Sequence, residues 1–326
     1  MSARVIASAI ALAALATLPY WVQGDYYVNV SSQILFYGVF ALGLNVLAGY
    51  AGLVSLGHAA LLGVTAYAAA YMLQAGFGHP VAIMTALVVG AIAMAVYAVL
   101  SLRATGIGFI MITLALGEII WGLAYRWISV TNGDNGINVT TRPEPFSISL
   151  NSPTAFYYAT LVVFLLALAS MTLFVRSPLG AVLMGTRDQP RRMTALGYHV
   201  WAVRFWACMF SGLLTAVSGL LFVYYEQFIS PQALDLTSSA EVLLMVIAGG
   251  AGTLFGPIVG AALVVIIKSV VSAYVTRWNM LLGAIFVAIV IFMPEGLVPG
   301  SVRLWGLARR RLRKRRASSA LADTRK

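Results

Sequence analysis

The sequence predicts an all-α protein, a polytopic bundle of transmembrane helices with about ten crossings, some of them short or broken. The first observation behind this prediction is composition: 61% of the 326 residues are hydrophobic and only 10% are charged, whereas a typical soluble domain has about 25% charged residues. The second is distribution, because the hydrophobic residues form long runs, many of them close to the ~20 residues that a spanning helix needs. So little charge could not cover a water-soluble fold, and that class is excluded.

The apolar runs define the expected crossings. They cover residues 5–22, 33–48, 53–73, 81–102, 107–128, 155–175, 205–225, 240–271 and 279–293. The first run follows an Arg and has small residues near its end, which is also the pattern of a cleaved signal peptide. However, it continues into Tyr20 and Trp21, and aromatic residues of this kind suit a membrane interface. We therefore expect a retained helix, with a cleaved signal as the alternative.

The charges of the loops orient the chain, because basic loops lie on the cytoplasmic side of a membrane. The segment 176–204 contains five arginines and is placed inside, together with the basic C-terminal end. The segment 129–153 contains two acidic residues and several Gly, Asn and Pro, and is placed outside. The run 205–225 then leads outward, and the chain must still end inside. The run 240–271 must therefore cross twice, or dip into the membrane and return.

That run is short for two crossings, so its helices should be short or broken at small residues. The candidates for the break are Gly249, Gly250, Gly252, Gly256 and Pro257. A broken helix persists in a membrane only where protein or a water-filled cavity satisfies its freed backbone groups, which makes the segment a functional candidate. A weak internal echo points the same way, since the pattern of Ala48–Gly52 recurs at Ala248–Gly252. In this topology the two copies run in the same direction.

The chain divides into a transmembrane domain, 1–302, with a long basic cytoplasmic loop at 177–200, and a basic cytoplasmic tail, 303–326. The tail holds ten of the 21 Lys and Arg residues. Such a run can bind nucleic acid. Behind a membrane segment we expect it to contact anionic lipid headgroups instead, and we expect no nucleic-acid partner.

Several polar side chains lie at membrane depth, where they are costly and usually face a cavity or a partner. They are Asn45, Ser55, His58, Thr113 and Glu118. His58 is interpreted either as a group that lines a pathway or relays protons, or as a hydrogen-bonding group between packed helices, and the second is favoured. Glu118 has the same two interpretations. Glu241 begins an apolar run, and we expect it at the membrane interface.

Catalytic chemistry has no support in the sequence. It contains no nucleophile elbow, no His-Glu-x-x-His motif and no paired carboxylates on one helical face. No Lys follows a Gly, so the phosphate-binding loop of nucleotide-hydrolysing proteins is absent. With one cysteine and no Cys/His cluster, no metal site is expected. We expect no enzyme, no catalytic residues and no cofactor in this chain, so any ATP would be hydrolysed by another subunit.

Five motifs in order carry a resemblance to a known family. They are Gly43–Gly52 running into Ser55–Ala59; Thr113–Ala115 with Gly117–Ile119; Thr131–Ile137; Ser177–Gly180 leading to Arg187-Asp188 and Ala195–Gly197; and Gly249–Pro257 with Gly260-Ala261. With these motifs the chain, from residue 33 to residue 293, resembles the M-type permease subunit of ABC importers for branched-chain amino acids and related small solutes.

The resemblance implies a multi-pass protein of a bacterial inner (plasma) membrane, with its C-terminus in the cytoplasm. It also implies a second homologous permease chain, two cytoplasmic ATPase subunits that bind ATP, and a periplasmic solute-binding protein. The expected solute is a branched-chain amino acid, although relatives move urea, amides and aromatic acids. The alternatives are a secondary transporter driven by an ion gradient through His58 and Glu118, and an intramembrane enzyme, for which the sequence supplies no catalytic dyad.

The resemblance also assigns roles to residues. A coupling helix over 187–197 would fit a cleft in the ATPase. Its candidates are Arg187, Asp188, Arg191, Arg192, Thr194, Ala195, Leu196 and Gly197. The sequence departs from the family here, because residues 192–194 read Arg-Met-Thr where Glu-Ala-Ala is usual. The candidates for the translocation path are Asn45, Ser55, His58, Thr113, Glu118, Gly249, Gly250 and Gly252.

Overall fold

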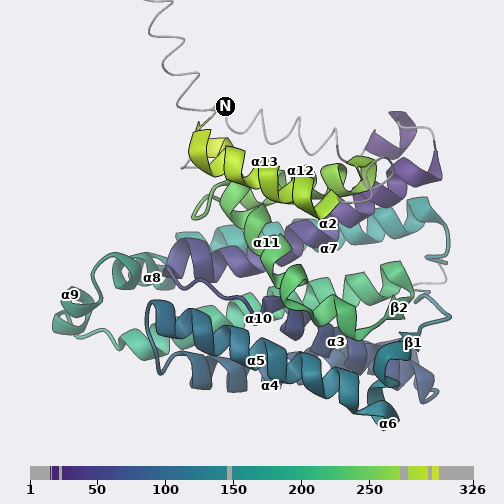
Figure 1. The fold of residues 1–326 in the computed structure, drawn as a ribbon, viewed down its shortest axis with the longest axis horizontal. Helices are drawn as coiled ribbons and strands as arrows, with labels where there is room; N and C mark the ends of the chain where they lie inside the picture. The colour runs from purple at the N-terminus through teal and green to yellow at the C-terminus, as the bar shows by residue number, and fades with distance from the viewer. Residues whose placement is uncertain are drawn as a thin grey trace, which may run out of the picture.

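The structure is a computed structural model, and it describes residues 15, 17–21, 24–144, 149–271, 278–292 and 296–300. Its regular structure is almost entirely helical (Figure 1). Five helices in these residues are long and apolar enough to cross a membrane. They are α2 (Asp25–Asn45, continued by the π-helix η1, Val46–Ala51), α4 (His79–Ser101), α5 (Ile107–Arg126), α7 (Pro153–Arg176) and α10 (Val200–Glu226). Four shorter helices complete the bundle: α3 (His58–Gln74), α11 (Leu236–Gly249), α12 (Gly256–Val271) and α13 (Trp278–Phe292). The predicted class, a polytopic helical bundle, is confirmed.

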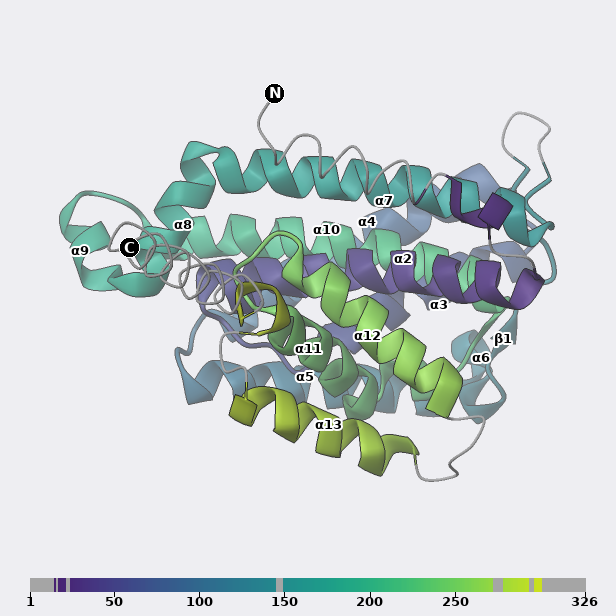
Figure 2. The ribbon, with the colours of Figure 1, turned by 90° about the horizontal axis from the view of Figure 1, so that it is seen from above.

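The connecting segments gather at the two ends of the bundle (Figures 1 and 2). One end carries α8 (Pro178–Asp188) and α9 (Pro190–Ala195). The other end, called the ribbon end below, carries small elements between α5 and α7 and between α10 and α11. They are α6 (Ile128–Thr131), η2 (Gly133–Asn135), β1 (Ile137–Asn138), β2 (Phe228–Ile229) and η4 (Pro231–Leu234). β1 and β2 pair in an antiparallel ribbon. The segments 129–153 and 176–204, expected on opposite sides of the membrane, thus lie at opposite ends.

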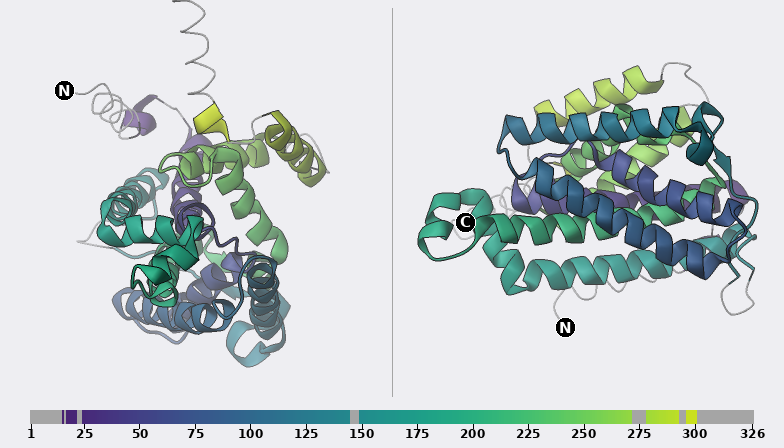
Figure 3. Two further views of the ribbon diagram at one scale, coloured as in Figure 1. Left: turned by 90° about the vertical axis from the view of Figure 1, so that its left-hand side faces the viewer. Right: turned by 90° about the horizontal axis from the view of Figure 1, so that it is seen from below.

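Helix α2 lies at the centre of the bundle. In its most apolar window 83% of the residues are buried, against 22–28% for α4, α5 and α7. Helix α10 is the second central helix, at 61%. The two pack through small residues, because a methyl group on Gly43 would lie 3.1 Å from the Ser211 carbonyl oxygen. Small residues of this kind let helices approach closely in membranes. Figure 3 shows the other helices around this pair, seen from the α8–α9 end and from below.

Helix α2 begins earlier than predicted, at Asp25 rather than residue 33. The extra turns contain polar residues, which lower the hydropathy. Two of them are accommodated within the helix, since the Ser31 and Ser32 hydroxyls donate to the carbonyls of Tyr27 and Val28 at 2.8 Å and 3.0 Å. A count of apolar residues cannot detect a serine that satisfies itself in this way.

The break predicted within 240–271 is confirmed. The segment forms two short helices, α11 and α12, which run side by side and are joined by residues 250–255. Three glycines bring the two helices together: a methyl group on Gly249 would lie 1.8 Å from the Gly256 carbonyl oxygen, and one on Gly260 1.8 Å from that of Met245.

Most of the first predicted crossing, 5–22, and the whole tail, 303–326, lie outside the described residues. The retention of the first helix and the cytoplasmic position of the tail therefore stay predictions.

Candidate functional site

The two glycine-rich breaks of the chain meet inside the bundle. The first follows α2 and η1, at Gly52, which has a φ of +69°. The second follows α11, where Gly250 and Gly252 have φ values of +118° and +79°. A methyl group on Gly49 would lie 2.3 Å from the Gly252 nitrogen, so the two backbones are in direct contact. The structure thus brings together the two copies of the sequence echo. We call this contact the break crossing.

Asn45 connects the two sides of the break crossing. Its side-chain oxygen accepts a hydrogen bond from the Gly252 backbone N–H at 2.9 Å, and its side-chain nitrogen donates to the Thr253 carbonyl at 2.9 Å. The residue is fully buried. A backbone group left unsatisfied in such a place costs about 1–3 kcal/mol. One amide therefore satisfies a donor and an acceptor that the break frees.

Arg187, the second-last residue of α8, also reaches the break crossing. Its guanidinium donates to the Gly49 carbonyl. Its Cγ covers the face of Gly52, where a methyl group would lie 2.9 Å away. The side chain is nevertheless 47% exposed, and its Nε lies 3.9 Å from the Asp188 carboxylate. The predicted role of Arg187 in coupling to an ATPase stays a prediction, and the structure adds that its guanidinium contacts the inside of its own chain.

The helix predicted over 187–197 is divided in two. Helix α8 ends at Asp188, Gln189 adopts a non-helical conformation, and α9 starts with Pro190, which lacks the N–H needed to continue the first helix. The pair folds back on itself, with Met193 against Gly185. Gly197 ends α9 in the left-handed region at φ +87°. The Tyr198 and Gly197 amides donate to the Met193 and Thr194 carbonyls, which is the Schellman arrangement.

The other predicted coupling residues lie on the outside of this pair of helices. Asp188, Arg191, Arg192, Thr194, Ala195, Leu196 and Gly197 are exposed. Leu196 is 66% exposed, and Arg191 and Arg192 of the same helical pair are exposed as well. The surface combines positive charge with apolar groups at the tip of the molecule.

His58, Ser55 and Thr113 form a second cluster next to the break crossing, all of them fully buried. His58 Nε2 lies 2.9 Å from the Ser211 hydroxyl, and Nδ1 lies 3.0 Å from that of Ser55. Because Ser211 donates to the Gly43 carbonyl at 2.6 Å, it accepts from His58 Nε2. The Thr113 hydroxyl accepts from the Leu56 N–H at 3.3 Å.

The Tyr97 hydroxyl completes the cluster and has two possible acceptors for its one proton. The Ser55 hydroxyl lies 2.8 Å away and the Thr113 carbonyl 3.3 Å away, so Ser55 is the nearer. With the proton of His58 on Nε2, Ser55 donates to Nδ1 and Tyr97 donates to Ser55. A neutral His58 thus satisfies the whole chain of hydrogen bonds. These contacts are of the kind expected from the helix-packing interpretation that the sequence favoured, and the role of His58 stays a prediction.

Glu118 lies apart from this cluster. Its neighbour Gly117 packs on Gly57, at 3.0 Å from the methyl position of Gly117 to the Gly57 Cα. Glu118 itself points away and is exposed in the middle of α5. Of the predicted path residues, the structure brings together Asn45, Gly249, Gly250 and Gly252 at the break crossing and places Ser55, His58 and Thr113 beside it; Glu118 joins neither group.

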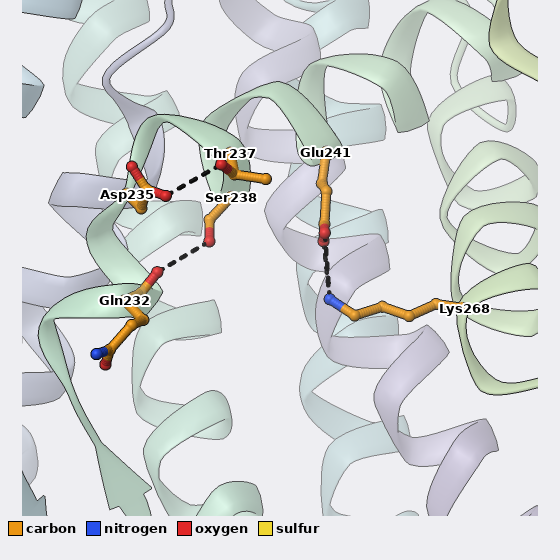
Figure 4. A network of polar contacts seen from close by, with 6 residues as sticks. All are labelled: Gln232, Asp235, Thr237, Ser238, Glu241 and Lys268. Carbon is orange, nitrogen blue, oxygen red and sulfur yellow. Dashed lines mark hydrogen bonds and ion pairs between the residues drawn. The ribbon is translucent and has the colours of Figure 1, made fainter. Parts of the chain in front are cut away.

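A third polar region lies near the ribbon end (Figure 4). Lys268 of α12 donates to both oxygens of the Glu241 carboxylate on α11, at 3.0 Å and 3.2 Å. Glu241 was expected at the membrane interface, but its side chain is only 12% exposed and is held in this ion pair. The sequence interpretation missed the partner because the two residues are 27 positions apart, on different helices. The available signal was the pair of opposite charges near the two ends of the apolar run 240–271.

These features define a class: a multi-pass permease, with broken helices meeting inside the membrane domain and a projecting helical pair at one end. The family model for the permease component of branched-chain amino acid transport systems matches residues 26–290. The chain therefore belongs to that family, whose members are the inner-membrane permeases of ABC importers. Members of this family are the transport component of the importer and are not themselves catalytic.

Curated relatives agree with the family. The chain is 26% identical over 296 residues to the high-affinity branched-chain amino acid transport system permease protein LivM of Salmonella typhimurium and of Escherichia coli, covering 83% of this chain and 70% of each relative. It is 28% identical over 244 residues to the autoinducer 2 import system permease protein LsrC of Yersinia enterocolitica, covering 71% of this chain and 65% of that relative. No solved structure matches the chain.

Proposed function

We propose that this chain is one of two permease subunits of an ATP-driven importer and that its solute is a branched-chain amino acid. The family match over most of the chain supports the importer. The LivM relatives support the solute, and they cover more of this chain than the LsrC relative, whose name indicates autoinducer 2. The observation that carries the proposal of a second permease chain is the position of Glu118.

Glu118 stands among exposed apolar residues on the outer face of α5. Met111, Ile119 and Leu123 share its exposure, as expected for a helix that faces lipid or another chain. A carboxylate in the middle of a spanning helix is too costly to face lipid. A homologous permease chain therefore covers this face, and the path for the solute runs between the two chains, where water reaches Glu118.

The exposed surface of α8 and α9 is the docking site for the ATPase. The chain itself has no phosphate-binding loop, so hydrolysis takes place on separate subunits. Leu196 and the arginines of α9 contact the ATPase, while Arg187 connects the docked element to the break crossing. A rigid-body movement of α8 and α9 then reaches the two broken helices through one side chain.

The geometry does not support the alternative of an ion-coupled transporter. His58 is enclosed in a chain of hydrogen bonds that a neutral imidazole satisfies. Glu118 is exposed on α5, whereas Gly117 faces the interior, and no hydrogen bond in the described residues joins Glu118 to His58. A proton relay between them would need a connection that the fold does not provide.

The test is co-expression of the chain with the genes that neighbour its own, followed by purification and an ATPase assay in lipid. We expect a second permease and an ATPase to co-purify, and a solute-binding protein loaded with leucine to stimulate hydrolysis. A cysteine at position 118 should cross-link to the second permease, whereas one at the buried position of Tyr157 should not. A chain that purifies alone and transports leucine without ATP would contradict the importer. Stimulation by an autoinducer 2 binding protein, and not by a leucine-binding one, would contradict the solute.

A further inference from the structure

A cavity of about 300 Å³ lies near the ribbon end, enclosed by α2, α3, α10, η4, α11 and α12. Small-molecule sites in proteins start at about this size. Two hydrogen bonds at the start of α11 lie at its rim. The Thr237 hydroxyl donates to the Asp235 carboxylate at 3.0 Å, and the Ser238 hydroxyl donates to the Gln232 carbonyl at 3.3 Å (Figure 4).

Three charged side chains line this cavity: Glu226, Glu241 and Lys268. Lys268 is paired with Glu241. Glu226 makes no ion pair or hydrogen bond within the described part of the chain, although its carboxylate interacts electrostatically with Lys268. The two carboxylates outnumber the ammonium group, so the cavity has a surplus of negative charge.

The position of Glu226 strengthens this surplus. It is the last residue of α10, a helix of 27 residues. The C-terminus of a helix carries partial negative charge and favours cations over anions. Its carboxylate is exposed and makes no hydrogen bond or ion pair in the described residues, so the cationic group of a ligand can reach it.

Part of the lining of the cavity is apolar. Phe40 of α2, Leu62 of α3 and Phe222 of α10 line it. A ligand for this cavity thus has an ammonium group, a second polar group that can approach Lys268, and a compact hydrocarbon part. Those are the parts of an α-amino acid with an apolar side chain.

We propose that this cavity is a binding site within the permease for a zwitterionic apolar amino acid. The solute's ammonium group binds Glu226, its carboxylate approaches Lys268, and its side chain packs on Phe40, Leu62 and Phe222. The proposal rests on the proposed function for the identity of the solute. It goes further by assigning a chemical selection for the zwitterion to this chain, in addition to that of a binding protein.

The test measures binding to the purified importer complex in lipid nanodiscs, without ATP and without the binding protein. The probes are L-leucine, 3-methylbutylamine, which lacks the carboxylate, and 4-methylpentanoate, which lacks the ammonium. We expect leucine to bind more tightly than either. Glu226→Gln should weaken leucine and the amine by about 10- to 100-fold, the range of a hydrogen bond to a charged group.

The double variant Glu241→Gln/Lys268→Gln removes the ion pair without leaving one charge alone. It should weaken leucine by about tenfold and leave the amine unchanged, because Glu226 remains. Glu144→Gln is the matched control, since it removes a carboxylate at the same end that does not line the cavity. Leucine affinity should then stay within about twofold.

The outcomes separate the two proposals. A complex that takes up leucine with its binding protein and ATP, but binds none in this assay or binds it equally well as Glu226→Gln, overturns the cavity and leaves the proposed function intact. Equal affinity for leucine and the amine overturns the role of Lys268. A complex that neither binds nor takes up leucine overturns both.

Discussion

The break crossing and the cavity near the ribbon end are both polar regions, and both involve α2, α11 and α12. They are nevertheless built in opposite ways. At the break crossing every named polar group has a partner within the chain, and backbones touch where a single methyl group would not fit. In the cavity a carboxylate lacks a partner in the described residues, and there is room for a ligand. A closed contact of this kind suits a joint that transmits movement, whereas an open one suits recognition. The predictions below test that contrast.

The largest effect is expected at Gly49. In Gly49→Ala the new methyl group would lie 2.2 Å from the Asn45 side-chain oxygen and 2.3 Å from the Gly252 nitrogen. Overpacking of this kind costs about 1–3 kcal/mol or more, so the thermal unfolding temperature in detergent should fall strongly. Gly283→Ala on α13 is the control, because nothing lies within 4 Å of its methyl position. Equal unfolding temperatures for the two variants would contradict the close contact.

A smaller loss is expected for Asn45→Ala. The Gly252 N–H and the Thr253 carbonyl would both lose their partner, at about 1–3 kcal/mol in all, because the shorter side chain leaves room for water to bind one of the two groups. The measurement is again thermal unfolding, with the exposed Asn138→Ala of β1 as the control. A variant as stable as wild type would mean that water, and not Asn45, satisfies the break.

For Arg187→Gln we expect about 1 kcal/mol of lost stability, because the side chain is half exposed and water screens its hydrogen bond to Gly49. The clearer effect is on coupling. The ATPase should still co-purify, while stimulation of hydrolysis by the loaded binding protein should fall severalfold. Arg191→Gln should do the reverse and weaken ATPase association, since Arg191 lies on the exposed face of α9. The same phenotype in both variants would place Arg187 in the docking surface.

The smallest effect is expected at the rim of the cavity. Thr237→Val removes an exposed hydrogen bond to Asp235 and should cost about 0.5–1 kcal/mol or less. Its effect on leucine affinity should be small, because the rim shapes the cavity without touching the solute. A loss of leucine binding as large as that of Glu226→Gln would move the site from the cavity to its rim.

The sequence alone predicts much of the architecture, and its errors have physical causes. The break in 240–271 follows from two observations. Loop charges place both 176–204 and the C-terminal end on the cytoplasmic side, so the chain between them must cross the membrane an even number of times. The glycines then mark where the long run is broken. The early start of α2 escaped detection, since Ser31 and Ser32 hide their polarity in local hydrogen bonds.

The candidate sites were less predictable than the fold. The echo of Ala48–Gly52 at Ala248–Gly252 marked both breaks, but only the fold shows that they touch. Ser211, a partner of His58, and Tyr97, a partner of Ser55, lie on other helices and look like ordinary packing residues in sequence. Arg187 belongs to a basic loop by composition, and nothing in that composition indicates that its guanidinium turns inward.

The break crossing also sets the order in which the protein can be completed during its synthesis. Asn45 finds its partners at Gly252 and Thr253, 207 and 208 residues further along the chain. At about 5–20 residues per second the ribosome needs roughly 10–40 s to make that stretch. During that time Asn45 lacks both of these partners. A nascent chain truncated before α11 therefore contains a buried amide whose partners have not yet been made.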